Sequence, residues 1–377
     1  MEFRLTEDQQ SLKELAERIL SEGSTDETLR AFDAGDAPFD RKLWQTLGEA
    51  GLLGIGIEEQ FGGTGFGLFE LGLLLEEQGR TLAPLPIHAT VVMGALPIQQ
   101  FGTDEQKAQW LPAAVGGQAI LTAALEEVGN VDVSRPMLQA EVSGNGWKLT
   151  GAKTAVPYGA EADRVIVAAQ TDEGIAVFLV DPSAPGVTIS PQRSTSGEPQ
   201  AEIRFDGAQF SGSDLLGSVE DGADILNWIV RHGRLGLTAI QLGITHEALQ
   251  RTARYSSERI QFGRPLGSMQ AVQQRAADGF IDVEAMRSAY LRAVWLLEQG
   301  EECEAEVAAA KYWAAIGGHR VTHTSQHLHG GMGADIDYPI HRFFLRAKQI
   351  ESALGGTTPM LAVIGREIAA GNLRPLT

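Results

Sequence analysis

The sequence predicts an α+β fold in which a helical segment, a β-rich segment and a second helical segment follow one another along 377 residues. Apolar residues recur at helical spacing near both ends of the chain, whereas the middle contains short runs rich in β-branched residues. Glycine, proline and aspartate separate these runs, as turns require. Because a chain of this length exceeds one compact core, we expect two or three domains.

Residues 1–118 are predicted to form an N-terminal α-helical domain. Thr6 is placed to cap the first helix, and Gln9 is placed to complete a capping box with it. Three apolar stripes at helical spacing then mark buried helix faces: Leu12, Leu15, Ile19 and Leu20; Leu43, Trp44 and Leu47; and Leu71, Leu74 and Leu75. Glycines between residues 62 and 67 lack the GxGxxG spacing of a dinucleotide site, so we interpret them as a structural turn.

Residues 119–221 are predicted to form a middle β-domain, and residues 222–377 a C-terminal α-helical domain. Runs such as WKLTG, RVIVAAQT and GIAVFLV are typical of strands, and Gly144-Asn145-Gly146 predicts a hairpin turn. Helical periodicity returns after residue 222, with these predicted core positions: Met269, Val272, Phe280, Val283, Met286 and Leu297.

Charge and cysteine usage narrow the classes of function. A formal net charge of −19 disfavours nonspecific binding to nucleic acid or to anionic membranes, and we expect neither as a partner. Cys303 is the only cysteine, which excludes an intramolecular disulfide and a cysteine-based zinc cluster. The N-terminal residues lack a secretory pattern, and no apolar run reaches the ~18 residues of a membrane-spanning helix. We therefore expect a cytoplasmic protein.

Five segments of the sequence resemble segments of one known protein family. They are FGGTG at 61–65, FGTDEQKAQWLPAAVGG at 101–117, GAKTAVPYGAEAD at 151–163, ERIQFGRPLGSMQAVQ at 258–273 and HGGMGADIDYPIHR at 329–342. In this order they resemble segments of the acyl-CoA dehydrogenase family. The resemblance implies FAD as cofactor, an acyl-CoA substrate, and a fold with N-terminal helices, a middle β-domain and a C-terminal helical bundle.

In this family, FAD crosses a subunit interface, and one chain holds the adenosine-diphosphate part of a flavin seated mainly in its neighbour. The resemblance implies eight cofactor-binding residues here: Arg259, Gln261, Phe262, Gln270, Gln326, His327, Gly330 and Gly331. An arginine suits pyrophosphate because it offers a fixed charge and several donors, and glycines permit close backbone approach.

Several alternatives to this assignment stay open. The family's glutamine before the glycine pair aligns with His327, while Gln326 is displaced by one position, so either side chain could reach the cofactor. Arg259 could instead form a surface ion pair, with Phe262 in the helical core. His319, His323 and His327 share helical spacing, but we predict no metal site because no acidic or cysteine ligand accompanies them.

The family's catalytic base is missing from this sequence. The base is usually a glutamate in a YEGT-like segment, which corresponds here to ALGGTT with Leu354 or Gly355 at the position. A minority of the family places it before an arginine in an earlier helix, where this chain has Gly233. None of these residues can accept a proton, so we predict that this chain contributes no catalytic residue.

The flavin-facing part of the β-domain also departs from the family. A TEPGAGSD-like segment becomes EEVGNVDV at 126–133, and a tryptophan–isoleucine–threonine run becomes Ala155-Val156-Pro157. Ala155 offers no aromatic face, and Pro157 has neither a hydroxyl nor a backbone donor. The chain therefore resembles the base-lacking subunit of the heteromeric α2β2 dehydrogenases of bacterial steroid side-chain degradation, a branch of lipid metabolism.

This resemblance implies a related partner subunit that carries the glutamate, a bulky steroid side-chain CoA thioester as substrate, and an electron-accepting flavoprotein. A first alternative is a homomeric dehydrogenase with a relocated base, such as Glu351 or Asp337. A second is a noncatalytic acyl-CoA-binding or interaction protein that retains only the fold.

Overall fold

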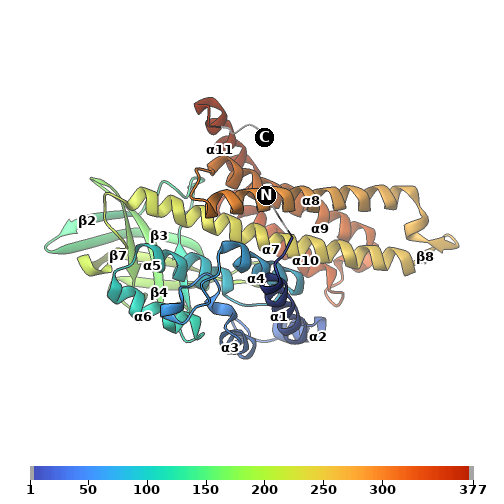
Figure 1. Ribbon diagram of the computed structural model, residues 1–377, viewed down its shortest axis with the longest axis horizontal. Coiled ribbons are helices and arrows are strands. Elements are labelled where there is room, and N and C mark those ends of the chain that lie inside the picture. Colours follow the sequence, from blue (N-terminus) through green and yellow to red (C-terminus); the bar gives the residue numbers. More distant parts are fainter. Residues whose placement is uncertain (1–3, 373–377) are drawn as a thin grey trace. The chain divides into compact units, whose positions relative to one another are not determined.

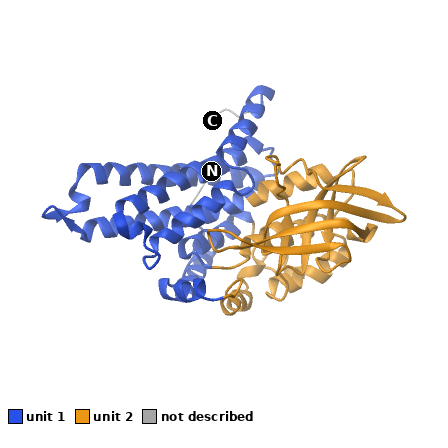
Figure 2. Cartoon of the chain, turned by 180° about the vertical axis from the view of Figure 1, so that it is seen from behind, with its two compact units in different colours: residues 1–35, 68–83, 234–377 blue, residues 36–67, 84–233 orange. Residues whose placement is uncertain are grey.

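The computed structural model describes residues 4–372 and divides into two compact units, which Figure 2 colours separately. Unit 1 comprises residues up to 35, 68–83 and those from 234 onward, and unit 2 comprises 36–67 and 84–233. Helices dominate unit 1 and a sheet forms the centre of unit 2, which confirms the α+β prediction. The three-domain division at residues 118/119 and 221/222 stays a prediction.

Unit 1 is a helical assembly in which α7, α8 and α9 are long neighbouring helices (Figure 1). A small apolar cluster joins one residue of each: Leu249, Val283 and Val321. The helices of this unit are α1 (Glu7–Gly23), α2 (Asp26–Asp33), α4 (Leu68–Thr81), the part of α7 (Gly222–Glu258) after residue 233, α8 (Gln270–Glu298), α9 (Glu304–Leu328), α10 (Ile340–Ser352) and α11 (Thr357–Ala370). A two-stranded hairpin, β8 (Ile260–Gln261) with β9 (Arg264–Pro265), connects α7 to α8, and short 3₁₀ turns lie at Leu266–Ser268 and Gly330–Ala334.

Local sequence chemistry explains where the first helix begins. The Thr6 hydroxyl accepts a hydrogen bond from the Gln9 backbone N–H at 3.2 Å, and the Gln9 side chain accepts one from the Thr6 N–H at 2.9 Å. This reciprocal pair is the predicted capping box, so two otherwise unpaired donors of the first turn are satisfied.

Helices α4 and α7 approach each other closely because of glycine. A Cβ atom on Gly243 of α7 would lie 1.8 Å from the Glu76 carbonyl oxygen of α4, and one on Gly79 would lie 2.0 Å from the Ile240 carbonyl oxygen. No side chain fits at either position, so any substitution there would separate the two helices.

Unit 2 combines a seven-stranded sheet with short helices. The sheet order is β1-β4-β2-β3-β7-β6, with β5 paired to β4; β1 and β2 run parallel to β4, and the other pairs are antiparallel. The strands are β1 (Leu121–Ala124), β2 (Gln139–Ser143), β3 (Gly146–Pro157), β4 (Arg164–Thr171), β5 (Gly174–Val180), β6 (Val187–Arg193) and β7 (Pro199–Ser211). The helices are α3 (Arg41–Glu49), a π-helix (His88–Ala95), α5 (Leu96–Phe101), α6 (Asp104–Val115) and the start of α7, with 3₁₀ turns at Leu52–Gly54, Glu59–Phe61 and Gly212–Asp214.

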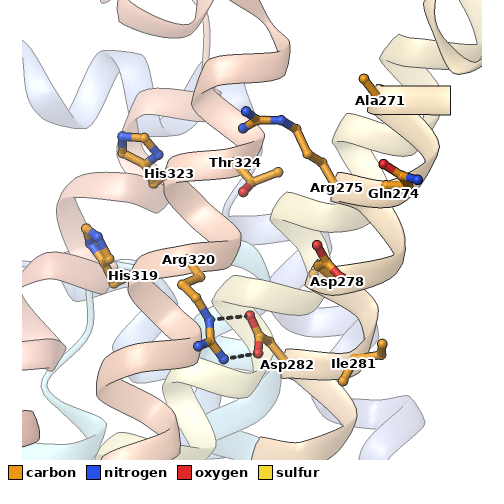
Figure 3. A pocket seen from close by; sticks show the side chains of 11 residues that line it. Ala271, Gln274, Arg275, Asp278, Ile281, Asp282, His319, Arg320, His323 and Thr324 are labelled. Atoms are coloured by element: carbon orange, nitrogen blue, oxygen red, sulfur yellow. Dashed lines mark hydrogen bonds and ion pairs between the residues drawn. The ribbon is translucent and has the colours of Figure 1, made fainter. Parts of the chain in front are cut away.

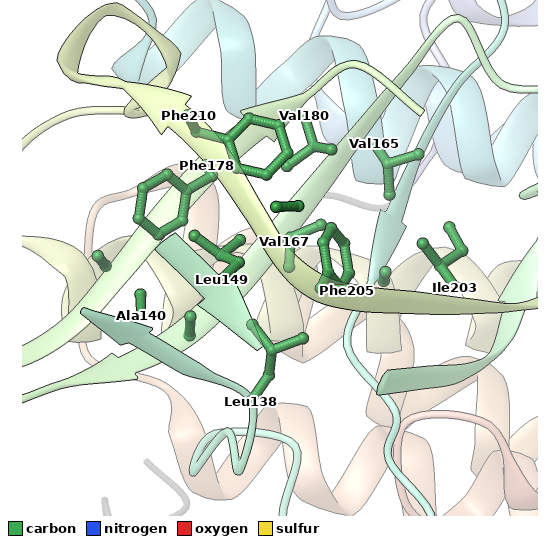
Figure 4. Close-up of a cluster of buried hydrophobic side chains, with 14 of the residues drawn as sticks. Leu138, Ala140, Leu149, Val165, Val167, Phe178, Val180, Ile203, Phe205 and Phe210 are labelled. Carbon is green, nitrogen blue, oxygen red and sulfur yellow. The ribbon is translucent and has the colours of Figure 1, made fainter. Parts of the chain in front are cut away.

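The predicted strands and turns of this unit are confirmed. WKLTG lies in β3, RVIVAAQT forms β4 and GIAVFLV forms β5. Ser143 pairs with Gly146 across a tight turn in which Gly144 has φ +62°, the positive value that a type II′ hairpin needs at its first central residue. The apolar faces of the strands meet in one core, which Figure 4 shows around Leu149, Phe178 and Phe205.

The predicted buried faces are confirmed in part. Trp44 and Leu47 of α3, Leu71 and Leu74 of α4, and Val283 and Met286 of α8 are buried. The prediction that Phe280 is a core residue is wrong, because 58% of its surface is exposed on the outer side of α8. Periodicity identifies the apolar residues of a long helix but not which of them a neighbouring element covers.

Candidate functional site

The segment from Arg259 to Gly263 forms the turn between α7 and α8. The Arg259 N–H donates to the Tyr255 carbonyl at 2.8 Å, which continues the last turn of α7, and the Arg259 carbonyl accepts from the Leu266 N–H at 2.9 Å. The Arg259 side chain is exposed and has no ion-pair partner within residues 4–372. The alternative that it forms a surface ion pair therefore finds no support in this chain.

Phe262 occupies the tip of the β8–β9 hairpin in a strained conformation. Its φ is +53° and that of Gly263 is +77°, as both central residues of a type I′ turn require. Left-handed backbone is unfavourable for a bulky residue such as phenylalanine, and 90% of the Phe262 surface is exposed. The alternative that Phe262 fills the helical core is wrong, because the hairpin directs this residue outward.

The two glutamines of this region are also exposed. The Gln261 amide donates to the Ile260 carbonyl at 2.8 Å, and Gln270 is the first residue of α8. Both therefore lie near the same hairpin as Arg259, at the end of the helical unit where Figure 1 labels β8.

The glycine pair follows the end of α9 and is open to its surroundings. Gly330 has φ +62°, and a Cβ atom on Gly330 or Gly331 would meet no other atom of the described chain within 4 Å. Packing inside this chain therefore does not require glycine at 331. By contrast, a Cβ on Gly333 would lie 2.1 Å from the Gln326 carbonyl oxygen, so Gly333 is a packing glycine.

The same turn separates the roles of Gln326 and His327. The Gln326 amide donates to the Gly333 carbonyl at 2.9 Å and so holds the turn after α9. The His327 side chain is exposed and has no hydrogen-bond partner within the described residues. His327 therefore has its polar atoms available to a ligand, whereas Gln326 has one amide N–H engaged in the turn.

An aromatic contact that sequence reasoning missed brings these two segments together. The Tyr255 ring, in the last turns of α7, stacks on the His329 ring with a centroid distance of 4.3 Å and an interplanar angle of 25°. Arg259 and the glycine pair therefore lie at one end of unit 1. Tyr255 and His329 each lie within four residues of a predicted site residue in the sequence. No sequence pattern, however, indicates that their two rings contact each other.

The position of the family's usual base holds an apolar residue in a rigid turn. Leu354 follows α10, is 6% exposed and has φ +53°. The buried Arg234 donates from Nε to the Leu354 carbonyl at 3.1 Å and from Nη1 to Glu304 at 3.1 Å. Lys311 Nζ donates to the Ile350 carbonyl at 2.8 Å. The turn is therefore well supported but has no side chain that accepts a proton.

The second base position has no titratable side chain, and the nearby acids Glu351 and Asp337 lie in different surroundings. The Gly233 carbonyl contacts His88 Nε2 at 2.9 Å, and glycine has no side chain to titrate. The Glu351 carboxylate pairs with Lys348 Nζ at 2.6 Å and lies 3.8 Å from His319 Nδ1. Asp337 is exposed. A relocated base at Glu351 would have to leave its ion pair before it could act.

His232 is a neutral, buried histidine beside that second position. Its Nδ1 lies 2.8 Å from the Trp228 carbonyl, and its ring stacks on Trp228 at 3.5 Å. Burial lowers the pKa of His232 to about 4, although the hydrogen bond to Trp228 acts in the opposite direction. At neutral pH the imidazole is therefore uncharged.

The flavin-facing segments of the β-domain use their own polar groups internally. The Ala155 N–H, at a residue with φ +50°, donates to the Gln192 side chain at 3.0 Å, and the Pro157 carbonyl accepts from the Thr122 hydroxyl at 2.7 Å. Glu127 accepts from Lys153 Nζ at 2.7 Å, and both side chains are almost fully buried. These segments therefore present few donors to a ligand.

An open pocket of about 690 Å³ lies between α8 and α9 (Figure 3). Arg320 forms a two-bond ion pair with Asp282 in it, and Arg275 extends across the pocket toward Thr324. His319 also lines the pocket; burial and the charge of Lys348 lower the pKa of His319. Within residues 4–372, no three histidine, cysteine, aspartate or glutamate side chains are placed to hold a metal ion.

Among the helices that the structure describes, none is both long enough and apolar enough to cross a bilayer.

Comparisons with known protein families cover almost the whole chain. The N-terminal domain model of acyl-CoA dehydrogenase matches residues 6–118, the middle domain model matches 122–208 and the C-terminal domain model matches 220–369. The chain is 42% identical to acyl-CoA dehydrogenase FadE27 of Mycobacterium tuberculosis, over 98% of this chain and 99% of that protein.

Two solved structures are similar over nearly the same length. One is the ChsE4-ChsE5 complex of Mycobacterium tuberculosis, with 42% identity, a TM-score of 0.92 and coverage of 98% of this chain and 99% of the matched chain. The other is a variant of the Tcur3481-Tcur3483 steroid acyl-CoA dehydrogenase, with 42% identity, a TM-score of 0.92 and coverage of 97% and 99%. With all three domain models matched in order and these relatives covered over 99% of their length, the chain belongs to the acyl-CoA dehydrogenase family.

Proposed function

We propose that this chain is the base-lacking subunit of a heteromeric, FAD-dependent acyl-CoA dehydrogenase, in which it holds part of the FAD of a partner chain. The observation that carries the proposal is an asymmetry. Arg259 and the Gly330–Gly331 turn are open to an outside ligand, whereas Leu354 and Gly233 stand where the family has its glutamate. The partner then supplies the catalytic glutamate and the flavin pocket.

The residues of the helical unit fit the adenosine-diphosphate part of FAD. Arg259 offers a charge-assisted contact to pyrophosphate, and the glycine pair admits a ligand against the backbone. Phe262 presents an exposed aromatic face, and His327, Gln261 and Gln270 present exposed polar side chains at the same end of the unit. The Gln326 amide N–H holds the turn after α9, and Gln326 stays one of the eight residues of the proposed site.

The β-domain does not fit the flavin ring system in the same way. The N–H of Ala155 is already bonded to Gln192, and Pro157 has no N–H to offer. FAD, when bound, supplies the hydride acceptor for α,β-dehydrogenation. In this proposal, the role of this chain is to bind and orient the cofactor from across an interface. The partner's carboxylate removes the proton.

The substrate and partners in the proposal follow the full-length relatives. Two of the most similar structures are complexes, one of ChsE4 with ChsE5 and one described as a steroid acyl-CoA dehydrogenase. We therefore assign a bulky steroid side-chain CoA thioester as substrate and an α2β2 assembly. Each dehydrogenation yields two electrons, so an electron-accepting flavoprotein completes the set of partners.

The experiment is Arg259→Ala in the complex, obtained by co-expression with a related chain that carries the glutamate. Loss of a charge-assisted contact costs ~1.5–3 kcal/mol, so FAD affinity should fall roughly tenfold or more. Equilibrium FAD titration at matched protein concentration measures this, and excess FAD should restore much of the activity.

Arg366→Ala is the matched control, because Arg366 of α11 is also exposed and without an ion-pair partner in residues 4–372. It should leave FAD affinity unchanged. Unchanged affinity in an intact Arg259→Ala complex would reject the proposed role. Separation of the subunits by Arg259→Ala alone would show that Arg259 supports assembly, which also contradicts the cofactor assignment.

A further inference from the structure

We infer that His329 is a positioning residue that fixes the glycine-pair turn against the end of α7, and so sets the spacing between Arg259 and Gly330–Gly331. The inference rests on the proposed function, because it concerns the same FAD-holding segments. His329 is not one of the eight residues assigned to the site. Because it is buried, it contacts neither the reacting atoms nor the open face of the site.

The geometry of three aromatic rings supports this role. The His329 ring stacks on Tyr255 at 4.3 Å and packs against the Tyr338 ring at 5.2 Å with an angle of 47°. Tyr255 and Tyr338 also contact each other edge-on at 6.4 Å. The cluster therefore joins the last turns of α7 to the residues on both sides of the glycine turn. These two segments are far apart in the sequence.

Short backbone connections link this ring cluster to Arg259 and to the glycine pair. The Tyr255 carbonyl accepts the Arg259 N–H, so Arg259 follows the stacked tyrosine by one helical turn. His329 immediately precedes Gly330, and the Tyr255 hydroxyl lies 4.0 Å from the Met332 sulfur. A shift of the His329 ring would therefore move the glycine pair relative to Arg259.

His329 is held as a neutral ring within the protein. It is 2% exposed, and its Nδ1 donates to the Ser325 carbonyl at 2.7 Å. Burial lowers the pKa of His329, which keeps the imidazole uncharged at neutral pH. Its Nε2 is buried without a partner in the described chain, so stacking, and not a second hydrogen bond, is what holds the outer edge of the ring.

The test compares His329→Ala with His329→Phe in the co-expressed complex. Phenylalanine keeps an aromatic face for Tyr255, and the Ser325 carbonyl keeps its bond from the residue 329 N–H. We expect His329→Ala to lower FAD affinity about tenfold and His329→Phe to restore it to within about threefold of the unmodified complex. Equilibrium FAD titration is the readout, with subunit stoichiometry checked for each variant.

Val363→Ala in α11 controls for general destabilisation, because Val363 belongs to a separate apolar cluster with Ala308 and Met360. It should lower the melting temperature but leave FAD affinity unchanged. The inference is overturned if His329→Ala binds FAD normally, or if His329→Phe is no better than His329→Ala. Failure of Arg259→Ala to weaken FAD binding would instead reject the proposed function itself, so the two failures are distinguishable.

Discussion

Burial gives His232 an acid–base behaviour that should be visible in the stability of the protein. An unfolded histidine has a pKa near 6.5, whereas burial lowers the pKa of folded His232 to about 4. Between these values the unfolded state binds a proton that the folded state does not. The contribution to folding is therefore complete above about pH 6.5 and is lost as the pH falls toward about 4.

The loss should approach ~3 kcal/mol over that window. His232→Gln should flatten the decline of unfolding free energy with falling pH, whereas His323→Gln, at an exposed position, should leave it unchanged. Denaturant unfolding at several pH values between about 7.5 and 4.5 measures both slopes. Identical slopes for His232→Gln and the unmodified chain would contradict the prediction.

Restoring a carboxylate at Leu354 should not by itself produce an enzyme. Leu354→Glu would place an acid in the family's base position, but Ala155 and Pro157 would still offer little to a flavin in the same chain. We expect no acyl-CoA-dependent reduction of an electron-accepting dye by the isolated variant. Leu354→Gln is the uncharged control of similar shape, and turnover by the glutamate variant alone would show that the flavin side is competent.

At the scale of an element, the loop after β1 depends on a buried ion pair. Glu127 accepts from Lys153 Nζ and from the backbone N–H groups of Met137 and Leu138, at 2.6 and 2.9 Å respectively. Burial disfavours the Glu127 carboxylate, but these partners outweigh it and hold its pKa below the usual value. The pair therefore fixes β3 to the loop.

Breaking this pair should cost far more than breaking an exposed pair on the same strand. Lys153→Met leaves a buried carboxylate unpaired and should reduce the unfolding free energy by ~3–5 kcal/mol. Lys148→Met removes the exposed Lys148–Glu141 pair and should cost less than about 1 kcal/mol. Denaturant unfolding monitored through the β-domain compares them, and equal losses would show that burial does not control this pair.

The whole molecule should fail to retain FAD when it is purified alone. It lacks a carboxylate at Leu354 and Gly233, the Ala155 N–H in its β-domain is already bonded to Gln192, and its Arg259 segment is exposed. We expect little flavin absorbance from the isolated chain and clear absorbance after co-expression with a glutamate-bearing partner. Stoichiometric FAD with substrate-dependent bleaching in the purified homomer would favour the homomeric alternative, and no colour with any partner would favour a noncatalytic binding protein.

The sequence by itself determined the α+β class, the capping box at Thr6 and Gln9, and the hairpin at Gly144. These features depend on bonds between near neighbours and on side-chain periodicity, which are written in short stretches of sequence. Recognition of the family segments further predicted the FAD cofactor and the absence of a glutamate at Leu354. The eight cofactor-binding residues stay a prediction, which the Arg259 experiment addresses.

Only the tertiary structure decided which of the predicted side chains are exposed and which form contacts within the chain. The turn after α9 folds back so that Gln326 bonds to Gly333 and His327 stays exposed. Phe280 faces outward because no described element covers that side of α8, and Tyr255 meets His329 because α7 and α9 end side by side. Such contacts join residues far apart in the chain, so they depend on how helices pack, which local sequence chemistry does not specify.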